Sequence, residues 1–329
     1  MSCPACLSDN SKFFAHSVNK DASFKGFEYL QCLECLSIYL NVDHGEIQDS
    51  HSLTRFHEKN WDDDDLEFVK TSLEERAERL RPEVKEIEKQ LLNYGMKQTY
   101  RLLDFGCGEG SFILASLREG VDAYGIEPVE KALIAAKGLL RSFSDSYPDY
   151  NQRIVNSNAD DLAEKGFKNP FSIKDERTAP AFDVVCMRDV LEHIFDPESL
   201  LKNMKKLLEG KGLVYIQVPS GISLQVEVLR EYAWTFMAPF HRVLFSPQGL
   251  KKIITRAGYE VLEVSSTNTK VYGWTKGIAR QNDKHEYHSN LRKDETFRLL
   301  DYKQDDLMEN IAIGQGKGAE LRMFARVSI

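Results

Sequence analysis

Three glycines at alternate positions follow an apolar run that ends in an aspartate and a phenylalanine. The run is Leu-Leu-Asp-Phe at 102–105, and the glycines are Gly106, Gly108 and Gly110. This pattern predicts a buried strand at 101–105, a tight turn, and a helix at 111–119. Glycine lets the turn adopt a positive φ and lets a ligand approach the backbone, because no Cβ intervenes. In a doubly wound sheet, a nucleotide-like ligand binds at such a turn.

A second short strand ends in a carboxylate 23 residues after Asp104. Residues 121–126 lead to Glu127, and Pro128 follows where a helix at 128–140 can begin. A carboxylate at the end of the second strand can accept hydrogen bonds from both hydroxyls of a ribose. The spacing therefore favours an adenosyl ligand, whereas a glycine turn that serves packing alone would leave Glu127 unexplained.

The glycine spacing also separates two classes of nucleotide site. A dinucleotide-binding turn needs a third glycine where this chain has Ser111. The pattern Asp-x-Gly-x-Gly-x-Gly instead resembles motif I of the class I S-adenosylmethionine (SAM)-dependent methyltransferases. The resemblance implies SAM as the cofactor. It assigns contacts with SAM to Asp104, Gly106, Cys107, Gly108, Gly110, Glu127 and Pro128.

Four of the six cysteines form two matched pairs. The pairs are Cys3-Pro-Ala-Cys6 and Cys32-Leu-Glu-Cys35. Each pair can supply two thiolates from one tight turn, and two such turns complete a tetrahedral Zn²⁺ site. The 25 residues between the pairs accommodate a hairpin, with strand-like alternation over 24–31. Four thiolates leave no open coordination position, so we expect a structural zinc ion. Redox pairs and separate buried thiols are the alternatives.

Charge and hydropathy narrow the range of partners. The 329 residues carry a net charge of −8, with 42% hydrophobic and 29% charged residues. This acidic balance disfavours general nucleic-acid binding, which relies on Lys and Arg to neutralise phosphates. The sequence shows neither a signal-peptide pattern nor an apolar run of about 18 residues. We therefore expect a cytoplasmic protein without a membrane span.

Strands and helices alternate from residue 101 onward. Further strands are expected at 153–156, 182–187, 211–219, 259–266 and 320–327, and further helices after Asp196 and Ser246. The alternation predicts an α/β fold with a doubly wound, seven-stranded, mostly parallel Rossmann-like sheet. We divide the chain into a zinc-binding module at 1–40, a helical linker or cap region at 41–98, and a methyltransferase domain at 99–329. The last contains a helical insertion at about 275–315.

Two features of the region 41–98 affect this division. Pro82 is expected to split its apolar helical pattern into two helices. His44, His51 and His57 are irregularly spaced, which disfavours a metal site there.

Two later segments resemble the parts of the methyltransferase family that hold adenine and face the reacting atoms. Residues 157–162 look like the adenine-binding loop, in which Asn158, Ala159 and Asp160 are the expected contacts. Asn158 and Asp160 are equal candidates for the contact with the exocyclic amine. Residues 182–194 resemble motif IV. By that likeness, Arg188 at the end of the strand contacts the cofactor and Asp189 lies in the reaction crevice.

Methyl transfer from a sulfonium requires an oriented nucleophile and a group that removes its proton. His193 and His241 are the two candidates for this base, because the unperturbed pKa of histidine suits the task. Asp189 adds a carboxylate to the same expected site. Each histidine also has a plausible packing role.

The zinc module, the SAM core and the segment 241–247 together resemble bacterial methyltransferases of deoxysugars and polysaccharide sugars. Some of these methylate carbon with a Glu-His pair, but here Phe240 precedes His241. They also carry a long extra C-terminal domain, whereas this chain ends soon after its seventh expected strand. We therefore expect O-methylation of a sugar or sugar nucleotide. Aromatic residues that could line its pocket are Phe56, Trp61, Tyr232, Trp234 and Phe236.

Two other functions remain open at this point. An RNA methyltransferase could use the zinc module to dock RNA, although the acidic charge disfavours this function. A non-catalytic scaffold could retain the SAM fold for assembly, although a scaffold has no need of the glycine turn or Glu127.

Overall fold

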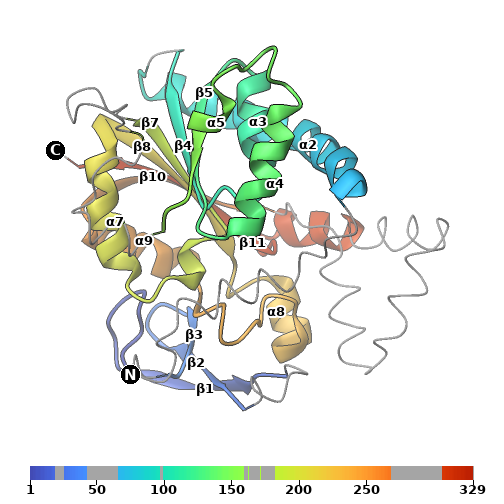
Figure 1. The fold of residues 1–329 in the computed structure, drawn as a ribbon. Coiled ribbons are helices and arrows are strands. Elements are labelled where there is room, and N and C mark those ends of the chain that lie inside the picture. Colours follow the sequence, from blue (N-terminus) through green and yellow to red (C-terminus); the bar gives the residue numbers. More distant parts are fainter. Residues whose placement is uncertain are drawn as a thin grey trace.

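In this computed structural model, a seven-stranded β-sheet runs between helices that cover both of its faces (Figure 1). Its strands, in spatial order, are β10 (Tyr259–Thr267), β11 (Glu320–Val327), β8 (Leu208–Pro219), β7 (Phe182–Arg188), β4 (Arg101–Phe105), β5 (Asp122–Ile126) and β6 (Ile154–Val155). The five strands from β8 to β6 are parallel, whereas β11 is antiparallel to both of its neighbours. The expected doubly wound, mostly parallel sheet is thus confirmed.

Several expectations fall on residues that the structure does not describe. The described residues are 1–18, 26–42, 66–96, 99–158, 162, 171, 182–267 and 306–328. Outside them lie His44, His51, His57, Phe56, Trp61, Ala159, Asp160 and most of the insertion expected at 275–315. Of that insertion, residues 306–314 are helical. Among the described helices, none is long and apolar enough to cross a membrane.

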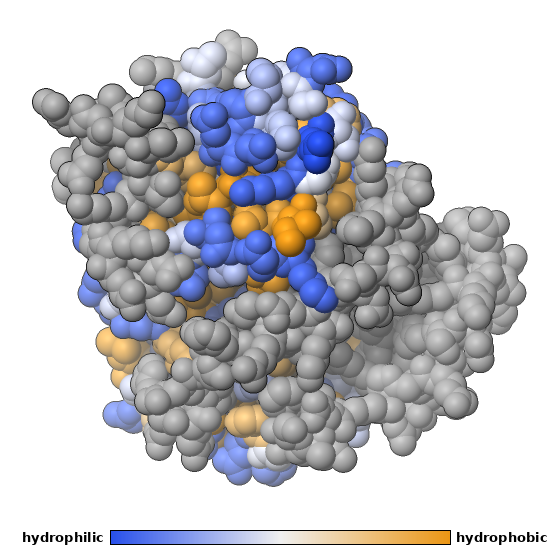
Figure 2. Space-filling model, viewed as in Figure 1, coloured by the Kyte–Doolittle hydropathy of each residue, from blue (hydrophilic) through white to orange (hydrophobic). Residues whose placement is uncertain are grey.

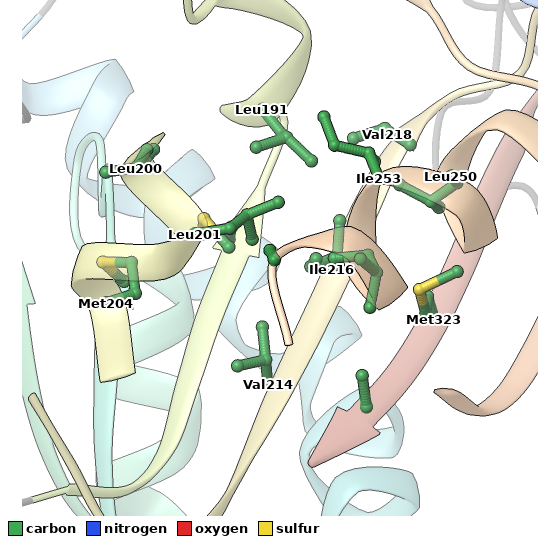
Figure 3. Packing of buried hydrophobic residues seen from close by; sticks show 14 of the residues in the cluster. Leu191, Leu200, Leu201, Met204, Val214, Ile216, Val218, Leu250, Ile253 and Met323 are labelled. Atoms are coloured by element: carbon green, nitrogen blue, oxygen red, sulfur yellow. The ribbon is translucent and has the colours of Figure 1, made fainter. Parts of the chain in front are cut away.

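The two faces of the sheet bury different sets of side chains. On one face lie α2 (Leu66–Asn93), α3 (Ser111–Arg118) and α4 (Glu130–Arg141). The other face is covered by α7 (Pro197–Met204) and α9 (Pro247–Arg256), whose Leu201 and Ile253 pack with Ile216 and Met323 (Figure 3). Alternate residues of β8 therefore point to opposite cores, as a strand buried on both sides requires.

Helix α2 runs unbroken through Pro82, so the expected division into two helices is wrong. A proline inside a helix costs about 3 kcal/mol, because it removes one backbone hydrogen bond and crowds the preceding turn. Here Leu80, Val84 and Ile87 lie on both sides of the proline and all are buried. The apolar stripe thus stays on one face of the helix, and its burial against the sheet keeps the two halves continuous.

The N-terminal residues form a second, smaller sheet with a distant part of the chain (Figure 1). Its order is β1 (Ser11–His16), β2 (Glu28–Cys32), β3 (Ile38–Leu40) and β9 (Val243–Leu244). Strands β1 and β2 pair antiparallel between the two cysteine pairs. Because β3 pairs with β9, the N-terminal module shares a sheet with the segment that follows His241.

The described surface seen in Figure 2 is mostly hydrophilic, with an apolar area over α4. Ile134 on this helix is 58% exposed. Single exposed apolar side chains of this kind are ordinary in soluble domains, and they do not by themselves indicate a docking surface.

Candidate functional site

The glycine turn joins β4 to α3 at the carboxyl edge of the sheet. The φ angles of Gly106, Gly108 and Gly110 are 79°, 53° and 81°. A Cβ on Gly106 would lie 2.6 Å from Cγ2 of Val190, and one on Gly110 would lie 3.0 Å from Cβ of Ala136. At Gly108 the same position has no atom within 4 Å. Two glycines therefore serve packing, and the third borders open space that a ligand can occupy.

Glu127 closes this turn from the end of β5. Its Oε2 accepts a hydrogen bond from the backbone N–H of Gly108, and its Oε1 accepts one from Val129, both at 2.8 Å. Burial raises the pKa of this carboxyl to about 7. Each oxygen retains a second lone pair, which can accept a ribose hydroxyl. Pro128 lies two residues before α4, so it directs the chain into the helix without being part of it.

Asp104 is a second buried carboxyl beside the turn. It is 2% exposed, and burial raises its pKa to about 7. Its Oδ1 has no hydrogen-bond partner. An unpartnered buried oxygen costs about 1–3 kcal/mol, so a ligand that donates hydrogen bonds or carries positive charge would relieve this cost. This oxygen and the open space at Gly108 fit SAM, which carries an ammonium group and a sulfonium.

Cys107 and Asn158 complete the described part of the expected cofactor site. Cys107 lies within the turn and is 7% exposed. Asn158 is partly buried, and its carbonyl accepts a hydrogen bond from the N–H of Leu162 at 3.1 Å. The adenine contacts assigned to this loop stay predictions.

The side chain of Arg188, which the sequence assigned to the cofactor, is engaged elsewhere. Its Nε and Nη2 donate to the two carboxylate oxygens of Glu83, at 2.9 and 3.3 Å. Its guanidinium lies 4.5 Å from the ring centre of Phe112, and the hydroxyl of Tyr215 donates to the same Glu83 at 2.8 Å. Arg188 thus ties α2 to the sheet. In the sequence, Glu83 is an acidic residue next to the apolar stripe of α2, and this position could have indicated a buried ion pair.

Two histidines from segments far apart in the sequence meet beyond the end of β7. The ring centres of His193 and His241 are 4.8 Å apart. Nδ1 of His193 lies 2.9 Å from the carbonyl oxygen of Phe240, and Nδ1 of His241 lies 2.7 Å from that of Thr235. A carbonyl oxygen can only accept, so each Nδ1 carries the hydrogen and each Nε2 is the acceptor nitrogen. Both rings can therefore act as bases at Nε2.

Glu192 joins the two histidines, and the sequence reasoning missed it. Its side chain is fully buried, and Oε1 lies 3.8 Å from Nε2 of His193. The ligand atoms of Glu192, His193 and His241 all lie within 4.8 Å of one another. Two imidazoles and one carboxylate can hold a divalent cation with a coordination position open for substrate. Without an ion, the carboxylate can stabilise a protonated imidazole. The signal was present, because a Glu-His pair stands at 192–193 even though none stands at 240–241.

Asp189 lies at the start of the same segment in a left-handed conformation. Its φ is 57°, a value that aspartate adopts more readily than most residues other than glycine. Its N–H donates to the carbonyl of Gln217 at 3.0 Å.

The N-terminal sheet supports the segment that carries His241. The hydroxyl of Tyr29 donates to the carbonyl oxygen of His241 at 3.3 Å. Phe236 packs edge-on against Tyr29 and is 5% exposed, so it belongs to the core and not to a substrate pocket. Trp234 lies with its ring centre 6.2 Å from that of His241, and Tyr232 packs partly buried against the same core.

The four N-terminal cysteines converge in two matched turns. Sγ of Cys3 lies 3.7 Å from that of Cys35, and Sγ of Cys6 lies 3.5 Å from that of Cys32. In each turn the residue after the second cysteine has a positive φ and donates its N–H to the carbonyl of the first. A tetrahedral zinc ion with Zn–S bonds of about 2.3 Å places its sulfurs about 3.8 Å apart. The cluster therefore has the dimensions of a zinc site.

Replacing Glu127 by alanine is expected to weaken SAM binding by roughly 10- to 100-fold, because the carboxylate orders the Gly108 turn and can accept the ribose hydroxyls. Calorimetric titration with SAM measures this change. Glu130→Ala is the matched control, since Glu130 is exposed in the first turn of α4. Equal affinities of the two variants for SAM would remove Glu127 from the cofactor site.

Comparisons with known proteins agree with this geometry. A family model described as "Methyltransferase domain" matches residues 72–264, more than half of the chain. The ubiquinone biosynthesis O-methyltransferase of Paracidovorax citrulli is 31% identical over 118 residues, which cover 36% of this chain and 43% of that protein. The protein of the same name from Neisseria meningitidis is 26% identical over 191 residues, covering 56% of this chain and 73% of its own length.

A solved structure of a SAM-dependent methyltransferase from Archaeoglobus fulgidus superposes with a TM-score of 0.42 at 16% identity. The superposition covers 74% of this chain and 94% of that one.

Proposed function

We propose that this chain, which belongs to the family whose model is described as "Methyltransferase domain", is a SAM-dependent enzyme that methylates a hydroxyl oxygen of a small organic molecule. The observation that carries the proposal is the pair of acceptor nitrogens, Nε2 of His193 and of His241, beside the buried carboxylate of Glu192. A hydroxyl acceptor needs a base to remove its proton, and this group supplies one beyond the end of β7.

The chemical class of the acceptor is a finer proposal. The sequence resemblance favoured a sugar, but the relatives reported above are named ubiquinone biosynthesis O-methyltransferases and give no support to a sugar. Their name favours a hydroxyl on an aromatic ring. Because the chain spans only 43% of the length of the Paracidovorax protein, we carry over the type of acceptor group and not the substrate itself.

Each described side chain has one task in this proposal. SAM, when bound, supplies a methyl group on a positively charged sulfur. Asp104 and Glu127 hold the cofactor from the ends of β4 and β5. Nε2 of His241 or His193 accepts the proton of the acceptor hydroxyl, while the Nδ1–H bonds keep both rings in place. Glu192 stabilises the imidazolium that this transfer forms.

We also propose that Cys3, Cys6, Cys32 and Cys35 hold a structural zinc ion, and that residues 1–40 act with it as a unit. The matched turns and the Sγ distances support this assignment. The ion would stabilise a module whose sheet contacts the segment of His241. In this proposal the zinc has no part in methyl transfer.

The experiment that tests the proposed function uses SAM labelled in its methyl group and three sets of acceptors. Small aromatic alcohols, free sugars and total RNA are incubated separately with the full-length protein, and label is counted in each product. Label in an aromatic alcohol supports the proposal, and label in a sugar restores the acceptor class expected from the resemblance. Label in RNA, or binding of SAM without any transfer, would overturn it.

The affinity for SAM is expected to fall as the pH drops below about 7. The pKa of Asp104 and that of Glu127 are both raised to about 7 by burial, so both groups take up protons below that pH. Protonation removes the negative charge that attracts the cationic cofactor. For each carboxyl that binds SAM only in its ionised form, the affinity for SAM falls by up to about tenfold for every pH unit below its pKa.

Calorimetric titrations at pH 8 and pH 6 test this dependence, with an expected increase in the dissociation constant of about tenfold or more. Glu127→Gln removes one of the two groups and should make the pH dependence shallower. An unchanged dissociation constant between the two pH values would contradict the prediction.

A further inference from the structure

Arg242 is a buried cation immediately after His241. It is 7% exposed, and its Nε donates to the carbonyl oxygen of His193 at 3.1 Å. Its guanidinium carbon lies 3.0 Å from the ring centre of Phe195, and its backbone N–H donates to the carbonyl of Glu192 at 2.8 Å. Among the described carboxylates, none forms an ion pair with this side chain.

This arrangement is costly for a guanidinium. Removing a charge from water carries a penalty of several kcal/mol, which one carbonyl and one aromatic ring offset only in part. Two other shielded arginines among the described residues face carboxylates. Arg188 is paired with Glu83, and Arg153 with Asp149. Among the described residues, Arg242 has no carboxylate partner of this kind.

The position of Arg242 indicates which molecule would carry that group. Its side chain is bonded to the backbone of His193, the residue whose imidazole is a candidate base. A ligand that contacts both the histidines and Arg242 would therefore be the acceptor of the methyl group. The guanidinium lies over the ring of Phe195, and its two terminal nitrogens are the donors that a bidentate contact with an anion would use.

We propose that Arg242 binds a carboxylate or phosphate of the acceptor, so that the enzyme methylates an acidic hydroxy compound. This inference rests on the proposed function, because it assigns the acceptor to the crevice of His193 and His241. A neutral acceptor of the same shape would leave the guanidinium buried without a counter-charge, and would bind more weakly.

The test compares an acid with its neutral amide on the full-length, zinc-loaded protein saturated with S-adenosylhomocysteine. The probes are 3,4-dihydroxybenzoate and 3,4-dihydroxybenzamide, titrated by calorimetry, with inorganic phosphate as a competitor. We expect the wild-type protein to bind the acid at least about tenfold more tightly than the amide. Arg242→Gln should abolish this preference without weakening the amide, and Arg242→Lys should retain part of it.

Arg230→Gln is the matched control. Arg230 also lies over an aromatic ring, that of Phe14 at 4.6 Å, and donates to the carbonyl of Phe14 at 2.6 Å. Its side chain is 55% exposed, however, so it has no buried charge to satisfy. The preference for the acid should survive in this variant.

The competitor identifies the source of the anion. If inorganic phosphate binds more tightly than the acid and displaces it, the acceptor carries a phosphate. If phosphate displaces the acid only weakly, the acceptor carries a carboxylate. Equal binding of acid and amide to the wild-type protein, or a preference unchanged in Arg242→Gln, would overturn the inference. Failure of the wild-type protein to bind S-adenosylhomocysteine would instead count against the proposed function.

Discussion

Replacing His241 by alanine is expected to lower kcat by roughly 10²- to 10⁴-fold while SAM affinity stays within about twofold. The imidazole is buried at 4% exposure, and its Nδ1–H bond to Thr235 directs Nε2 as the acceptor nitrogen. Neither atom contacts the glycine turn or Glu127, so binding of the cofactor should persist. Initial rates with labelled SAM, together with calorimetric titration of SAM, measure the two quantities separately.

His193→Ala decides which imidazole takes the proton. The base is the residue whose loss is rescued by added imidazoles at rates that rise with the pKa of the imidazole, because filling a cavity does not depend on base strength. His16→Ala serves as the control, because His16 is exposed on β1 and lies against Phe13. Full kcat in both His193→Ala and His241→Ala would rule out a histidine base. Loss of activity in a chelator that leaves the zinc content of the protein unchanged, reversed by Mg²⁺ or Mn²⁺, would assign the Glu192 group to a metal.

The strands of the large sheet could be predicted closely, because a parallel strand buried on both faces is a short apolar run with turn residues on each side. The expected strand at 101–105 matches β4, and the one at 182–187 is one residue shorter than β7. Strand β8 begins at Leu208 instead of Lys211. Its first residues belong to the sheet because Leu208 pairs with Phe182. No local sequence pattern predicts this contact.

The failures have a common physical origin, since each depends on a partner far away in the sequence. Pro82 was expected to break a helix, but the sheet that α2 covers keeps it continuous. Glu192 was not predicted as a site residue, because it comes close to His241, 49 positions later in the sequence, only in the folded chain. The sequence likewise could not predict that the charge of Arg242 is buried without a carboxylate partner, because both are properties of the folded chain.

The cofactor and acceptor sides of the site were also predicted unequally. Asp104 and Glu127 could be predicted from local spacing, because each lies at or next to the end of a strand that the sequence pattern itself identifies. The histidines instead depend on the small sheet, in which β3 pairs with β9 and Tyr29 bonds to the carbonyl of His241. The N-terminal module therefore supports the segment of His241 directly. A domain boundary placed at residue 40 assigns these two contacting parts to different units.

If the proposed zinc ion is bound, replacing Cys35 by serine is expected to release it and to lower the melting temperature by roughly 10 °C. Structural zinc contributes about 10–16 kcal/mol in isolated finger peptides, and a module of 40 residues has little core of its own. We expect kcat to fall as well, because the β3–β9 pairing would no longer hold the segment of His241. Metal content by mass spectrometry, thermal unfolding and initial rates follow the three effects.

The position of Cys35 explains why the damage should spread from the module to α9. The hydroxyl of Ser246 donates to its carbonyl oxygen, and a Cβ on Gly249 would lie only 3.2 Å from its Sγ. Loosening the cysteine turn therefore disturbs the first turn of α9 and the strand before it. Leu33→Ser is the matched control, because Leu33 lies between the ligands and is 44% exposed. Wild-type protein that binds no zinc, or Cys35→Ser protein with unchanged stability and kcat, would contradict this account, whereas intact SAM binding in Cys35→Ser beside a lowered kcat would place the effect at His241.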